Sequence, residues 1–139
     1  MKKFVLIFFA LAVFAPISTS AQSAAVRKEI RNMSCPEAEI KAVKLGPSKS
    51  GYLSSCPASG ANRSESIFEK NRSLYDGGII TFLKTTHLGY YDFTDFSYSP
   101  SGGSTETKKW NGSKYVRYKC QEFEFNKNGK AGNYRPCSY

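Results

Sequence analysis

The chain has 139 residues and a formal net charge of +9, from 20 Lys and Arg against 11 Asp and Glu. That length fits one domain, or one domain plus a processed segment, and an apolar content of 40% argues against a chain that is disordered throughout. The four cysteines show no C-x-x-C spacing and the single histidine is His87, so neither a zinc site nor hydrolysis by a histidine network is expected.

The N-terminus has the pattern of a bacterial export signal. Two lysines precede an uninterrupted apolar run over residues 4–14, which Pro16 ends. Small residues at 19–21 are those that a signal peptidase requires, so we expect a signal peptide over residues 1–21 and one exported domain over residues 22–139. The apolar run is short for a bilayer span, and an uncleaved anchor helix is the alternative. The expected location is therefore the periplasm or the outside of the cell.

Export changes the interpretation of the cysteines. In an oxidising compartment, an even number of cysteines is most simply explained by disulfides, and here there would be two. Three pairings are open, and we favour Cys35–Cys56 with Cys120–Cys137 because partners close in sequence meet more readily. A redox-active pair is the alternative, which the absence of C-x-x-C spacing disfavours.

The exported chain is predicted to begin with a helix. Val26, Ile30 and Met33 lie at helical spacing and predict a helix over residues 23–33 with one apolar stripe. The helix should end before Pro36, because a residue that precedes proline is pushed away from helical angles.

Strands separated by turn-rich segments are expected next. A hairpin is predicted around the turn at residues 46–50, although its first arm also suits a helix. Residues 57–64 are expected to form a loop, and the Gly-Gly turn at 76–78 separates the next two strands. The strands expected in this half of the chain cover residues 38–45, 51–56, 66–70 and 79–84.

The apolar alternation slips within residues 90–98. Tyr91 and Phe93 share one parity, whereas Phe96 and Tyr98 share the other. A strand with a period of two cannot bury both pairs on one face without an extra residue, which predicts a β-bulge near residues 94–95. The alternative is a strand with both faces half-buried.

The dipeptide Asn111-Gly112 predicts a two-residue type I′ hairpin loop, because both loop positions need a positive φ. This loop would pair Glu106 with Arg117 and Thr107 with Val116. An ion pair across the strands would then support the hairpin.

The predicted hairpin has two distinct faces. Val116, Tyr118 and Cys120 share the face that we expect to point inward. The opposite face would form an exposed aromatic-basic surface, where cations meet negative charge and rings stack on sugars or bases. Its predicted ligand-binding residues are Lys108, Trp110, Tyr115, Arg117 and Lys119. The fold class predicted from these elements is mainly β (α+β), a small antiparallel sheet or meander with one N-terminal helix and disulfides.

Three turn motifs and a cysteine follow one another in the second half of the chain. They are Asp76-Gly77-Gly78-Ile79-Ile80, Gly89-Tyr90-Tyr91-Asp92, the segment from Trp110 to Tyr115, and Cys120. In this order, residues 76–120 resemble a recurrent pattern of small secreted bacterial domains of unestablished activity. The resemblance implies a fold and no catalytic role. The pattern carries further cysteines near the position of Cys56, which this chain lacks.

His87 is the one candidate for acid–base chemistry. With Glu65, Glu69 or Lys84 beside it, it would suit a phosphodiesterase site of the kind found in small secreted ribonucleases. A lone histidine in a loop is more often solvated or packed, so we expect no catalytic residue.

Asp92 and Asp95 are the candidates for a carboxylate pair or a calcium site. Residues three apart on a strand point to opposite faces, so a shared metal is not expected without a bulge. Asp92 is expected to brace the turn at residues 89–91 instead. We predict no metal and no cofactor.

The function predicted from these features is that of a non-enzymatic binding or interaction module. The positive charge favours an anionic glycan, an anionic lipid or an acidic protein, whereas the absence of a nucleic-acid motif disfavours nucleic acid. The alternatives are an inhibitor or immunity protein against an envelope enzyme, and a ribonuclease-like hydrolase that uses His87.

Overall fold

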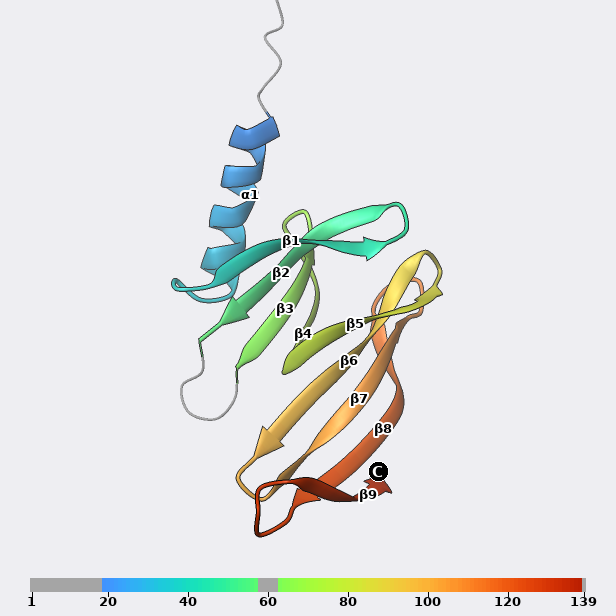
Figure 1. Cartoon of the computed structure of the whole chain (residues 1–139). Helices are drawn as coiled ribbons and strands as arrows, with labels where there is room; N and C mark the ends of the chain where they lie inside the picture. The colour runs from blue at the N-terminus through green and yellow to red at the C-terminus, as the bar shows by residue number, and fades with distance from the viewer. Residues whose placement is uncertain (1–18, 58–62, 139) are drawn as a thin grey trace, which may run out of the picture.

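The computed structural model describes residues 19–57 and 63–138, which form one helix and nine strands in two antiparallel sheets (Figure 1). The helix α1 spans Thr19–Met33. The first sheet contains β1 (Glu39–Gly46), β2 (Lys49–Cys56), β3 (Ser64–Glu69) and β4 (Arg72–Gly77). The second sheet contains β5 (Ile79–His87), β6 (Tyr90–Ser99), β7 (Gly102–Trp110), β8 (Tyr115–Phe125) and β9 (Ala131–Pro136). Within each sheet every strand pairs with the next one in the chain, so the predicted mainly β, α+β fold is confirmed.

Both predicted disulfides are present. Cys35 is bonded to Cys56 and Cys120 to Cys137. They are compatible with export. Most of the predicted signal peptide, residues 1–18, lies outside the described residues, and residues 19–21 belong to α1. No helix in the described part of the chain has the length and apolar character needed to cross a membrane.

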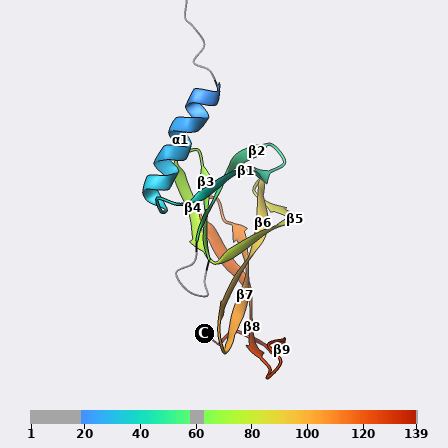
Figure 2. The same ribbon diagram turned by 60° about the vertical axis from the view of Figure 1, so that its left-hand side comes forward.

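The helix α1 covers the face of the first sheet that points away from the second sheet (Figure 2). Ile30 is completely buried there against Ile40 and Phe68, and Val26 packs at the edge of this cluster. Met33 is 52% exposed, so the predicted apolar stripe holds for two of its three residues. The helix ends at Met33, and the chain then turns toward β1, which removes the third residue from the sheet.

The two sheets pack on each other through a second and larger cluster. Leu45, Ile67 and Leu74 come from the first sheet. The second sheet contributes Ile80, Tyr90, Phe93, Trp110 and Tyr115. Because side chains alternate along a strand, Ile67 points to this cluster while its neighbour Phe68 points to the helix. The first sheet is therefore the middle layer between α1 and the second sheet.

The hairpin predicted around residues 46–50 is confirmed, because its first arm forms β1 and pairs with β2. Two features of the first sheet differ from the sequence prediction. The strand β3 begins at Ser64, inside the predicted loop, of which residues 58–62 lie outside the described residues. The strand β4 was not predicted. A register shift opposite Ile67 and Phe68 breaks its alternation, so a period of two is not visible in its sequence.

The predicted register of the β7–β8 hairpin is wrong. Trp110 pairs with Tyr115 and Lys108 with Arg117, so the loop has four residues, 111–114, in place of two. The reason is local: the Asn111 side-chain oxygen accepts hydrogen bonds from the backbone N–H groups of residues 113 and 114, each at 3.0 Å. Only Gly112 in this loop has a positive φ, whereas a type I′ turn needs two.

The predicted bulge in β6 is also wrong. The pairing of β6 with β7 is regular from Phe93 to Ser99. The irregularity lies in β5, between Phe82 and Thr86. The alternative, a strand buried on both faces, holds: Phe93 lies in the core, while Phe96 stacks on Phe123 on the other face.

Candidate functional site

The aromatic half of the predicted binding surface is part of the core. Trp110 and Tyr115 are only 5% and 6% exposed. The Trp110 ring lies 4.5 Å from that of Tyr90 and 5.1 Å from that of Tyr115. A ring buried in this way cannot stack on a ligand, so the prediction that Trp110 and Tyr115 face outward is wrong.

The basic half of that surface is largely engaged within the protein. Lys108 forms an ion pair with Glu106 and lies 5.3 Å from the centre of the Tyr75 ring. Arg117 lies 3.3 Å from the second oxygen of Glu106, and Lys119 is exposed. Burial alone would raise the pKa of Glu106, but the hydrogen bonds and charges of Lys108 and Arg117 outweigh it and lower that pKa. These cations therefore hold a carboxylate and do not surround an exposed ring.

His87 is held by a carboxylate that the sequence assigned to another role. Its Nδ1 lies 2.7 Å from Asp92, which is almost completely buried and also accepts a hydrogen bond from Thr85 at 2.7 Å. Glu65 and Glu69 bind other groups: the first accepts from Ser55 and the backbone N–H of residue 80, and the second from the Tyr90 hydroxyl. The acid–base cluster proposed from the sequence is therefore not assembled around His87.

Asp95 joins the two sheets. Its carboxylate accepts hydrogen bonds from the Tyr75 hydroxyl at 2.5 Å and from the Gly78 backbone N–H at 2.8 Å. Burial, followed by this bond to Asp95, raises the pKa of Tyr75. The described residues contain no group of three or more His, Cys, Asp and Glu side chains that could hold a metal ion.

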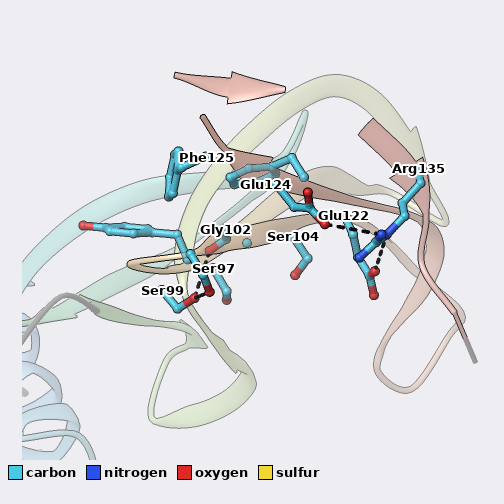
Figure 3. Close-up of a pocket in the computed structure, with 12 residues that line it drawn as sticks. Ser97, Ser99, Gly102, Ser104, Glu122, Glu124, Phe125 and Arg135 are labelled. Carbon is cyan, nitrogen blue, oxygen red and sulfur yellow. Dashed lines mark hydrogen bonds and ion pairs between the residues drawn. The ribbon is translucent and has the colours of Figure 1, made fainter. Parts of the chain in front are cut away.

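A groove of about 610 Å³ lies at the opposite end of the second sheet from the buried Trp110 (Figure 3). We call it the serine groove. It is lined by Ser97, Tyr98, Ser99, Ser101, Gly102, Gly103, Ser104, Glu122, Phe123, Glu124, Phe125 and Arg135. This end of the sheet extends beyond the first sheet, so its polar face is not covered by another layer (Figure 1).

A polar row crosses four strands in the groove. Ser97 on β6 pairs with Ser104 on β7, Ser104 pairs with Glu122 on β8, and Glu122 pairs with Arg135 on β9. Directly opposed residues of antiparallel strands share a face, so these side chains form one line. Figure 3 shows Arg135 reaching both carboxylates: its guanidinium lies 3.3 Å from Glu122 and 3.4 Å from Glu124.

Aromatic rings complete the groove. Tyr98 lies opposite Gly103, whose missing side chain leaves room for the Phe123 ring. Phe125 lines the groove from β8, and its ring packs 5.4 Å from that of Phe123. A Cβ atom at Gly103 would lie only 2.2 Å from the carbonyl oxygen of Ser97, so glycine is required for this close approach of the strands.

The disulfide Cys120–Cys137 fixes the edge strand β9 of the groove. It joins β8 to the residue that follows β9, and the Cys137 N–H donates to the Cys120 carbonyl oxygen at 3.4 Å. An edge strand held only by its ladder can separate from the sheet, whereas this covalent link holds β9 and Arg135 in place.

The sequence contains one signal for this site that the prediction did not use. Residues 122–125 alternate charge and aromatic ring, Glu-Phe-Glu-Phe, which is typical of a strand with one polar and one aromatic face. The serines at 97, 99, 101 and 104 carry no such pattern. Their contribution to one site depends on the pairing of β6, β7, β8 and β9.

No family model, curated protein or solved structure gives a significant match to the chain. The interpretation of the serine groove therefore depends on its own geometry.

Proposed function

We propose that the protein is an exported, non-enzymatic binding module whose serine groove binds a glycan chain. One observation carries the proposal: a Glu–Arg–Glu network on one face of the sheet and two aromatic residues from the other face, Tyr98 and Phe125, line the same open groove at the end of the sheet. A pyranose ring has an apolar C–H face that packs on an aromatic ring and hydroxyl groups that bond to charged side chains. Charge-assisted hydrogen bonds are the stronger ones, and they fix the orientation of the ligand.

The charges of the groove favour a neutral sugar or an amino sugar. Glu122 and Glu124 are two carboxylates against the single guanidinium of Arg135. An acidic glycan, expected from the net charge of the whole chain, would meet a net negative site here. The anionic ligand predicted from the sequence is therefore not assigned to this groove.

The two alternative functions, a ribonuclease-like hydrolase and an inhibitor or immunity protein, have less support. A ribonuclease-like site needs a second acid, base or cation beside the histidine, and His87 is held by Asp92 with the ring of Tyr118 6.5 Å away. An inhibitor or immunity protein would use an envelope enzyme as its partner and would not need a sugar in the groove.

The test is a calorimetric titration of the disulfide-bonded chain with oligosaccharides of four to six units, one β-1,4-glucan and one N-acetylglucosamine series. We expect one series to bind, and Tyr98→Ala and Glu124→Gln each to weaken binding about tenfold, which corresponds to about 1.4 kcal/mol. Tyr118→Ala is the matched control, because this exposed tyrosine lies at the other end of the second sheet and should leave the affinity unchanged. Absence of binding by both series, or an equal loss in Tyr118→Ala, would overturn the proposal.

A further inference from the structure

Two recesses that share a rim lie on the first sheet, far in sequence from the serine groove. The first, of about 550 Å³, is formed where the β1–β2 turn meets the β3–β4 turn. It is lined by Ser48, Lys49, Ser50, Glu69, Lys70, Asn71 and Arg72. The second, of about 490 Å³, runs from this rim to α1 and is lined by Ser23, Val26, Glu29, Ser50, Gly51, Tyr52, Lys70 and Asn71. We call them the cationic recess and the apolar recess.

The cationic recess has an excess of positive charge. It holds Lys49, Lys70 and Arg72 against one carboxylate, that of Glu69. Glu69 is already engaged, because Arg72 lies 3.0 Å from one of its oxygens and the Tyr90 hydroxyl donates to the other at 2.9 Å. Among the described residues neither lysine forms an ion pair. The Lys49 ammonium lies 4.6 Å from the centre of the Tyr90 ring, a contact that leaves its positive charge without a carboxylate, and Lys70 is exposed, so both positive charges can attract an anion.

Lys70 occupies a backbone position that normally belongs to glycine. It is the first of the two loop residues between the paired Glu69 and Arg72, and its φ is +56°. A side chain in this left-handed region is disfavoured, because its Cβ comes too close to the following carbonyl oxygen. Strained positions of this kind cluster at ligand sites, where the strain is offset by function. A lysine in this place adds charge at the expense of backbone stability.

The rim that the two recesses share is bonded to α1 and carries further hydrogen-bond donors. The Asn71 amide donates to Glu29 of α1 at 2.9 Å, which ties the β3–β4 turn to the helix. The hydroxyl groups of Ser48 and Ser50 line the opposite side. Lysine ammonium groups together with hydroxyl groups are suited to a phosphate group, which presents several acceptor oxygens.

The apolar recess indicates the kind of group that would be attached to the phosphate. It begins at the shared rim residues Ser50, Lys70 and Asn71 and continues along Val26 and the Tyr52 ring. A ligand that filled both recesses would have a phosphate at one end and an apolar group directly attached to it.

We propose that these two recesses form a second site, which binds an amphipathic phosphate ester. The phosphate lies between Lys49 and Lys70, and the apolar substituent lies against Val26 and Tyr52. A membrane phospholipid and a free alkyl phosphate share this chemistry. The site is separate from the serine groove, so its test is independent of the proposed glycan binding.

The experiment compares n-hexyl phosphate, inorganic phosphate and 1-hexanol by calorimetric titration of the disulfide-bonded chain. We expect hexyl phosphate to bind at least tenfold more tightly than inorganic phosphate, and 1-hexanol, which has the same apolar chain without a phosphate or a sugar, to bind not at all. Sedimentation with phosphatidylglycerol vesicles separates the two sources: co-sedimentation that hexyl phosphate reverses indicates a lipid, and its absence with retained hexyl phosphate binding indicates a soluble ester.

The variant Lys70→Gly separates a binding role from a structural one. Glycine adopts a positive φ without strain, so this variant should unfold at the same temperature as the wild type or higher, while its affinity for hexyl phosphate falls about tenfold. Lys49→Gln should produce a similar loss, and the exposed Lys127→Gln in the β8–β9 loop serves as the matched control. Equal binding of hexyl phosphate and inorganic phosphate, or unchanged affinity in Lys70→Gly, would overturn the proposal.

Discussion

Replacement of Trp110 by alanine tests directly whether this ring belongs to the core or to a surface. The register predicted from Asn111-Gly112 places Trp110 outside and Tyr118 inside. In the structure the positions are exchanged, since Trp110 is 5% exposed and Tyr118 is 55% exposed. Next to the loop, the observed pairing differs from the predicted one by two residues, which leaves the same side chains together on one face, so the exchange means that the hairpin turns its other face to the core. Trp110→Ala and Tyr118→Ala together therefore test which face of the β7–β8 hairpin is buried.

The structure indicates a large difference between the two variants. A buried tryptophan removes roughly 150–250 Å² from water, which at about 25 cal/mol per Å² is worth about 4–6 kcal/mol. Part of that area is already buried in the unfolded chain and alanine retains its Cβ, so we expect Trp110→Ala to lower the free energy of unfolding by about 3–5 kcal/mol. Tyr118→Ala loses two exposed contacts, with Lys109 at 4.7 Å from its ring centre and with the His87 ring at 6.5 Å, and should cost less than about 1 kcal/mol.

Urea unfolding followed by far-UV circular dichroism measures both losses. Trp110 is the only tryptophan of the chain, so wild-type fluorescence gives a second readout: emission should be blue-shifted in the folded protein and move to the red on unfolding. If Trp110→Ala does not fold, Trp110→Phe should fold with a smaller loss than the alanine variant. Equal losses in the two alanine variants, or a larger loss for Tyr118→Ala, would refute the assignment of Trp110 to the core.

Two further predictions concern the disulfide Cys120–Cys137 and the buried tyrosines. The double variant Cys120→Ser with Cys137→Ser removes a link across a sequence separation of 17 and should lower the free energy of unfolding by about 3 kcal/mol. It should also weaken oligosaccharide binding, because β9 carries Arg135. An unchanged urea midpoint and an unchanged affinity would contradict these two expectations. Burial raises the pKa of Tyr75 and of Tyr115 above the usual 10.0, with the hydrogen bond to Asp95 contributing at Tyr75. A tyrosine whose pKa is raised in the folded protein stabilises the fold fully below pH 10, and this stabilisation is lost as the pH rises further. The phenolate absorbance of these residues should therefore appear together with the loss of circular dichroism. Titration of every tyrosine near pH 10 in the folded protein would contradict this expectation.

Local patterns were sufficient for the elements whose determinants are close in sequence. Helical spacing of Val26 and Ile30 before Pro36 predicts α1, and two apolar segments around a Gly-Pro turn predict the β1–β2 hairpin. The cysteine pairs were predicted correctly because, in this chain, the partners nearest in sequence are joined. The mainly β class followed from the same reasoning.

The faces of the second sheet could not be predicted in this way. Trp110 and Tyr115 share a face in the predicted register as well as in the observed one, and which face points inward depends on where these rings find apolar partners. Those partners, Leu45, Ile67 and Leu74, come from the other sheet and from residues more than 30 positions away. The burial of two aromatic rings outweighs local preferences, so the packing of the two sheets decides which face of the hairpin belongs to the core.

The candidate sites show the same division between sequence and tertiary structure. The alternation of Glu122, Phe123, Glu124 and Phe125 is visible in the sequence and predicts a strand with one polar face. That Ser97 and Arg135 share that face is a property of the sheet alone, because strand pairing across β7 and β8 brings together residues with no sequence relation. The sequence by itself therefore determined most of the elements, the covalent links and the net charge. The packing of the two sheets decided which rings are core and which side chains form a site, since burial is a property of the assembled layers and not of a local pattern.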